Sequence, residues 1–121
     1  MENLETAEIK ERLEFLEFRQ KLLFENTDLS RYLFEMEVTE EQLKRIYNLM
    51  DALREEIREE KLVTHSAYEQ QIYEIVPAKR GNYHFAESIS QLLHEARRWP
   101  EVFEHVYGSM EKFKNYLNKE E

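Results

Sequence analysis

The chain has 121 residues, of which 36% are charged and 41% hydrophobic, and its formal net charge is −9. This length predicts a single domain over residues 1–121, and the absence of cysteine excludes disulfides, thiolate catalysis and cysteine-ligated metals. The acidic balance argues against binding to nucleic acid or to anionic membranes, and no run of residues is long and apolar enough to span a bilayer.

Residues that form turns are scarce, with only two glycines and two prolines in the chain. Folds with many strands need frequent turns, so this scarcity argues against an all-β protein. The acidic residues are almost all glutamate, which is a good helix former. We therefore predict an all-α fold, a bundle of about five to six helices with a long helix at the N-terminus.

The first predicted helix runs from about Thr6 to Phe24 and carries apolar residues on two faces. At 100° per residue, one stripe contains Ile9, Leu13, Leu16, Leu23 and Phe24, and the other contains Phe15, Phe18 and Leu22. A surface helix of a monomer needs only one such stripe, so the helix is covered on both faces, either by its own domain or by a partner. We expect the stripe of Phe15, Phe18 and Leu22 to mediate self-association, because soluble monomers avoid an exposed apolar patch of this kind.

Capping residues mark the next two helices. The polar run from Asn26 to Asp28 ends the first helix, and a short helix is expected over residues 29–36. Thr39 and Gln42 have the spacing of a capping box, which places the start of a second long helix near Glu40. That helix is expected to extend to about residue 60, with a heptad-like seam at Leu43, Ile46, Met50, Leu53 and Ile57.

The C-terminal half predicts four further helices from similar signals. Thr64 caps a helix that ends before Pro77, although residues 72–76 alone could also be read as a strand. A helix follows over residues 83–97, and Pro100 suits the first turn of the next one, which Gly108 closes as its C′ residue. Ser109 caps the last helix, which begins directly after it.

Catalytic and metal-binding patterns are not evident in the sequence. No serine lies in a glycine-flanked elbow, and Ser90 with His94 is only an isolated pair four residues apart. Glu101 and His105 share a helical face, but helical metal sites use repeated Glu-x-x-His elements, so a surface salt bridge is the favoured interpretation. We expect no cofactor, no metal and no enzymatic activity.

One loop offers a candidate anion site. Lys79 and Arg80 precede Gly81 and the start of a helix that carries His84, and free N–H groups at a helix N-terminus favour anions. The alternative is that Gly81 allows a tight turn and Asn82 caps the helix, which explains the same residue types without a ligand.

Several segments together resemble the YhaI-like family of small helical proteins from Firmicutes and their phages, which has no assigned function. The resemblance is carried by residues 15–18, residues 39–42, the run Gly81–Glu87 and the run Trp99–Phe103, and it extends over about residues 9–118. It implies an all-α domain in a bacterial cytoplasm, and it offers no catalytic or binding residues to carry over to this chain.

Three hypotheses for function follow. The first is a non-catalytic module that acts by protein–protein interaction and forms a homo-oligomer. The second is an acidic regulator of a basic protein partner, because residues 1–60 hold 17 acidic and 9 basic residues. The third is a small anion- or nucleotide-binding module around residues 79–84. The acidic N-terminal residues lack the apolar block of a signal peptide, so we expect a cytoplasmic protein.

Overall fold

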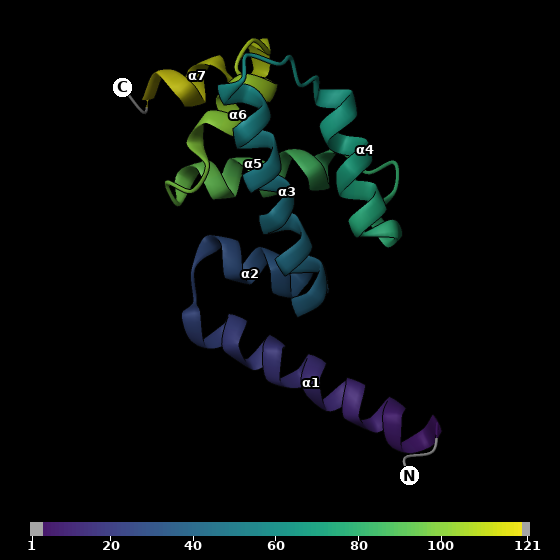
Figure 1. Cartoon of the computed structure of the whole chain (residues 1–121). Helices are drawn as coiled ribbons and strands as arrows, with labels where there is room; N and C mark the ends of the chain where they lie inside the picture. Colours follow the sequence, from purple (N-terminus) through teal and green to yellow (C-terminus); the bar gives the residue numbers. More distant parts are fainter. Residues whose placement is uncertain (1–3, 120–121) are drawn as a thin grey trace. The chain divides into compact units, whose positions relative to one another are not determined.

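The computed structural model describes residues 4–119, and this part of the chain is helical without any β-strand (Figure 1). It contains seven α-helices and one short 3-10 helix, so the all-α prediction is confirmed. The seven helices exceed the five to six expected for the bundle and equal the number of helical segments predicted one by one along the chain. The alternative interpretation of residues 72–76 as a strand is wrong, since a helix continues through this segment to Ile75. The chain divides into two compact units, the first ending at Lys44 and the second beginning at Arg45.

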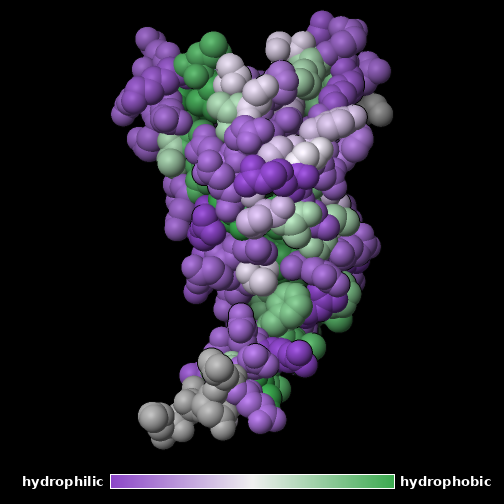
Figure 2. Space-filling view, turned by 90° about the vertical axis from the view of Figure 1, so that its right-hand side faces the viewer, coloured by the Kyte–Doolittle hydropathy of each residue, from purple (hydrophilic) through white to green (hydrophobic). Residues whose placement is uncertain are grey.

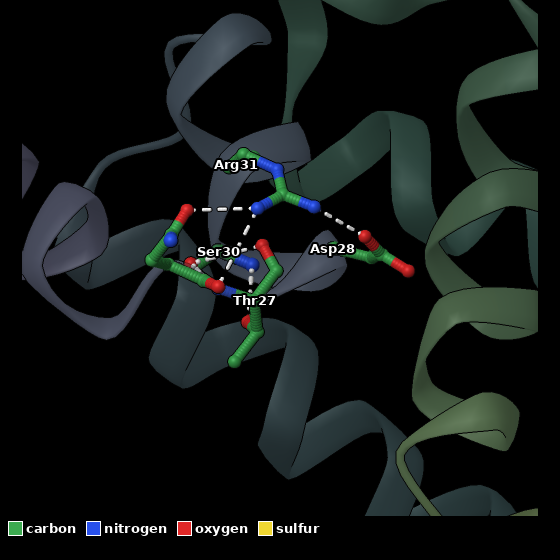
Figure 3. Close-up of polar contacts among 5 residues, drawn as sticks. Thr27, Asp28, Ser30 and Arg31 are labelled. Carbon is green, nitrogen blue, oxygen red and sulfur yellow. Dashed lines mark hydrogen bonds and ion pairs between the residues drawn. The ribbon is translucent and has the colours of Figure 1, made fainter.

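The first unit is built on helices α1 (Leu4–Glu25) and α2 (Asp28–Glu35), which lie side by side (Figure 1). Asn26 ends α1 in a left-handed conformation, with φ of 50°. Thr27 then caps α2 in a reciprocal capping box with Ser30, where each backbone N–H donates to the other residue's hydroxyl, at 2.8 and 2.9 Å (Figure 3). Arg31 of α2 donates to the Asn26 side chain at 2.7 Å and forms an ion pair with Asp28. Its side chain therefore connects the residue that ends α1 with the first residue of α2.

Helix α3 (Glu40–Arg58) begins where the capping box predicts. The Thr39 backbone N–H donates to Gln42 Oε1 at 3.0 Å, and the Gln42 N–H donates to Thr39 Oγ1 at 3.1 Å. Along α3 one apolar face is buried, which contains Ile46, Leu49, Met50 and Leu53. This helix therefore has the amphipathic pattern of a helix that packs on one side only.

The second unit contains most of α3 together with α4 (His65–Ile75), the 3-10 helix η1 (Pro77–Lys79), α5 (Tyr83–Glu95), α6 (Pro100–Tyr107) and α7 (Glu111–Lys119). Thr64 caps α4 by accepting the Ala67 N–H at 3.1 Å, and Pro100 begins α6, as predicted. The centre of the unit is aromatic, because the rings of Tyr68, Phe103, Tyr107 and Phe113 contact one another and are buried. Such pairs stabilise a core beyond the apolar area they bury.

The buried hydroxyl groups of this core have partners. Tyr68 donates to the Ala86 carbonyl at 2.9 Å, and Tyr107 donates to the Glu69 carboxylate at 2.6 Å. Burial raises the pKa of both tyrosines well above the ordinary value, and the bond to Glu69 raises the pKa of Tyr107 further. Both phenols are therefore neutral hydrogen-bond donors wherever the unit is folded.

The turn between α5 and α6 is fixed by aromatic and charged side chains. Trp99 adopts a left-handed conformation, with φ of 47°, and its indole N–H donates to Asp51 of α3 at 2.7 Å. Arg98 lies over the Tyr47 ring at 4.3 Å. Gly108 closes α6, as predicted, although as the C-cap residue with a right-handed φ of −62°, and its N–H donates to the Glu104 carbonyl at 3.0 Å. Helix α7 begins at Glu111, so the start predicted directly after Ser109, at Met110, is one residue early.

Candidate interaction surface

The two apolar stripes of α1 have opposite environments, and the expected assignment of the outward stripe is wrong. Phe18 and Leu22 are only 6% and 3% exposed, and Phe15 is half-buried. These three side chains therefore belong to the packed side of the helix, and the outward face is the other stripe.

Arg19 helps to fix the packed side of α1 against α2. Its guanidinium donates to the Phe34 carbonyl at 3.0 Å and lies 3.7 Å from the centre of the Phe34 ring. The same group lies 5.2 Å from the centre of the Phe15 ring. These contacts of the Arg19 cation with two aromatic rings and a carbonyl favour the orientation in which this side of α1 faces α2.

The outward stripe of α1 is a row of exposed apolar side chains. Its members have exposed fractions of 53% for Ile9, 54% for Leu13, 60% for Leu16, 54% for Leu23 and 91% for Phe24. Figure 2 shows hydrophobic surface next to the grey N-terminal residues, bordered by hydrophilic side chains. Five large apolar side chains on one helical face form a patch that the exposed Gln20 interrupts, whereas Leu62 is an exposed leucine outside this helix. We call this row the outer stripe.

A groove with a volume of about 740 Å³ lies within the first unit, between α1 and the start of α3. Phe15 and Phe18 are its aromatic lining residues, and Arg12 and Lys44 are its basic ones. The remaining charged groups of its lining are five glutamates: Glu8, Glu11, Glu14, Glu40 and Glu41. The groove is therefore acidic with an aromatic component.

The predicted anion-binding residues lie at the start of α5. Lys79 is half-buried at the end of η1, and Arg80 and His84 are exposed. Gly81 has a left-handed φ of 83°, and Asn82 caps α5 by accepting the Phe85 N–H at 3.2 Å. These two residues are explained by the turn and the cap, so anion binding stays a prediction that the geometry does not strengthen.

The histidine pairs considered from the sequence are not formed. Both ring nitrogens of His94 have other partners, the Tyr116 hydroxyl at 2.7 Å and Glu104 at 3.0 Å, and Ser90 donates to the Glu87 carbonyl. The surface salt bridge expected between Glu101 and His105 is replaced as well. Glu101 pairs with Arg54 at 2.6 Å, and His105 Nε2 accepts the Val63 backbone N–H at 3.0 Å. These side chains hold helices and loops together in the second unit.

Within residues 4–119, no cluster of three histidine, aspartate or glutamate residues could hold a metal ion. In the same part of the chain, no helix has both the length and the apolar character needed to cross a membrane.

Comparisons of the chain with protein families, with curated proteins and with solved structures find no match. The resemblance to the YhaI-like family therefore stays a prediction. The outer stripe of α1 and the acidic groove are the two candidate interaction surfaces of the first unit.

Proposed function

We propose that this protein acts through protein–protein interaction and self-association, and that the outer stripe of α1 is the surface by which two copies meet. The single observation that carries this proposal is the exposure of five large apolar side chains, between 53% and 91%, along one helix. Water contact of this much apolar surface is unfavourable, by roughly 25 cal/mol for each Å² that a partner could cover. The outer stripe runs from Ile9 to Phe24 and is about 23 Å long, which suits another helix as its partner.

The spacing of the outer stripe favours a second copy of α1 as that partner. Ile9, Leu13, Leu16 and Leu23 are separated by four, three and seven residues, and Gln20 occupies the interrupted position. Alternating steps of four and three residues are the pattern of a coiled-coil seam, in which apolar positions a and d meet those of a neighbouring helix. Because both copies present the same seam, a symmetric dimer covers both outer stripes at once.

Sedimentation equilibrium of the wild-type chain and of the variant Leu13→Glu with Leu16→Glu tests this proposal. We expect a concentration-dependent dimer for the wild type and a monomer for the variant, because dimerisation would bury four new carboxylates without partners. Leu62→Glu is the matched control, since Leu62 is 81% exposed and lies outside α1. A wild-type chain that stays monomeric at millimolar concentration contradicts the proposal.

A second candidate function is binding to a basic protein partner, and the acidic groove of the first unit favours it. Its five glutamates attract Lys and Arg side chains, and the half-buried ring of Phe15 offers a surface for their aliphatic stems or cationic heads. Calorimetric titration with a lysine- and arginine-rich peptide tests this function. We expect binding that weakens as salt rises and that is lost in the variant Glu11→Gln with Glu41→Gln. Glu55→Gln with Glu59→Gln, on carboxylates outside the groove, is the control.

A further inference from the structure

We infer that two copies of α1 pair in parallel, with their N-termini at the same end of the seam. This inference rests on the proposed self-association and adds the orientation of the partner. In the seam, Leu13 and Gln20 occupy a positions, and Ile9, Leu16 and Leu23 occupy d positions. The same register places Phe15 and Leu22 at c and Phe18 at f, on the opposite side of the helix. Parallel pairing therefore leaves the packed side of α1 in contact with its own chain.

The polar residue in the seam favours the parallel orientation. In a parallel pair each a position meets the same position of the partner, so Gln20 meets the partner copy's Gln20. Two amides can then donate to and accept from each other, and neither is buried without a partner. In the antiparallel pair that overlaps the seams most fully, Gln20 faces Ile9 of the other copy and its amide loses water without gaining a hydrogen bond. Gln20 is exposed in the single chain, so its amide is hydrated there.

The charges that flank the seam favour the same orientation. Positions g hold Glu5, Arg12 and Arg19, and positions e hold Lys10, Glu17 and Phe24. In a parallel pair each g residue faces the e residue five positions further along the partner. Glu5 then faces Lys10, and Arg12 faces Glu17, which gives four attractive pairs in a two-fold dimer. Within the described part of the chain, no ion pair engages any of these four side chains.

The antiparallel alternative is weaker electrostatically. Flanking residues then meet their own kind, e with e and g with g. In the register of greatest overlap Lys10 still meets Glu17, but Arg12 meets Arg19 of the other copy. Like charges in contact are destabilising, so attractive and repulsive pairs are equal in number. Arg19 also has its contacts with Phe34 of its own chain and is not free to move away.

Charge reversal at Arg12 tests the orientation, because the two alternatives predict effects of opposite sign. In the parallel dimer Arg12→Glu faces Glu17 and raises the dissociation constant, by about threefold to tenfold for two lost ion pairs and two new repulsions. The double variant Arg12→Glu with Glu17→Arg restores attraction and returns the constant to the wild-type range. In the antiparallel dimer Arg12→Glu relieves the contact with Arg19 and lowers the dissociation constant, which would overturn the inference.

Disulfide trapping gives a second, independent measurement. The chain has no cysteine, so Gln20→Cys introduces a single thiol in the seam. We expect this variant to form a covalent dimer rapidly in a glutathione redox buffer, and the control Glu14→Cys, on the side away from the seam, to remain largely monomeric. If the wild type is a dimer but Gln20→Cys does not cross-link and Ile9→Cys with Gln20→Cys does, the pairing is antiparallel and self-association stands. If the wild type is a monomer, both the orientation and the proposed function are wrong.

Discussion

The two longest helices, α1 and α3, differ in how they distribute their apolar residues. Along α3 one face is buried, with Ile46, Met50 and Leu53 at 0–1% exposed, and the other faces are largely polar. On α1 the apolar residues lie on two opposite faces, and only the face of Phe18 and Leu22 is buried. The contrast shows why the apolar face of a long charged helix can be overlooked. Two apolar stripes on opposite faces cancel when hydrophobicity is summed around the helix, so the helix does not score as amphipathic.

The largest expected effect compares two phenylalanines of the same helix. Phe18→Ala removes a ring that is 6% exposed and should destabilise the first unit by about 3–5 kcal/mol. Phe24→Ala removes a ring that is 91% exposed and should change the free energy of unfolding by less than about 0.5 kcal/mol. Urea denaturation followed by far-UV circular dichroism, at a concentration where the chain is monomeric, measures both. Equal effects would mean that the two faces of α1 are not distinct.

The tyrosines of the second unit predict an alkaline transition. Because Tyr68 and Tyr107 have raised pKa values in the folded state, the unfolded chain releases their protons first, near pH 10. Their contribution to stability is therefore complete below that pH and falls as the pH rises above it. The chain has seven tyrosines, so the absorbance change at 295 nm is taken as the difference between the wild type and the variants Tyr68→Phe and Tyr107→Phe. This difference should appear only together with loss of helical signal. A difference that appears at pH 10 in a chain that stays fully helical would contradict the burial of these two phenols with hydrogen bonds.

The smallest expected effect concerns the cap of α3. Thr39→Ala removes the hydroxyl that accepts the Gln42 N–H and should cost about 1 kcal/mol, visible as a lower urea midpoint. Thr39→Ser keeps the acceptor and serves as the control, with a midpoint close to that of the wild type. A Thr39→Ala midpoint equal to that of the wild type would show that the capping box adds nothing to the stability of α3.

Local features of the structure could be predicted from the sequence because their causes are local. The start of α3 depends on Thr39 and Gln42, three residues apart, and the start of α6 on Pro100. The two stripes of α1 also follow from residue spacing alone. Which stripe faces inward depends on the position of Phe34, a residue of another helix whose carbonyl and ring contact the Arg19 guanidinium. No spacing within α1 contains that information.

Residue spacing does not distinguish the outer stripe from the packed one. Ile9, Leu13 and Leu16 are four and three residues apart, and Phe15, Phe18 and Leu22 are three and four residues apart. The partners of His94 and Glu101 could not have been predicted, because Tyr116 and Arg54 reach them from distant parts of the sequence. The only sequence signal for the acidic groove was the excess of glutamate in the first half of the chain.

The position of Trp99 has a practical consequence for studying the two units. It is the only tryptophan in the chain, it is 9% exposed, and its indole is bonded to Asp51 within the second unit. Intrinsic fluorescence excited at the red edge of absorption therefore reports melting of the second unit alone, while ellipticity sums the helices of both. Coincident curves from the two probes would indicate one cooperative transition, and separated curves would give each unit its own melting temperature.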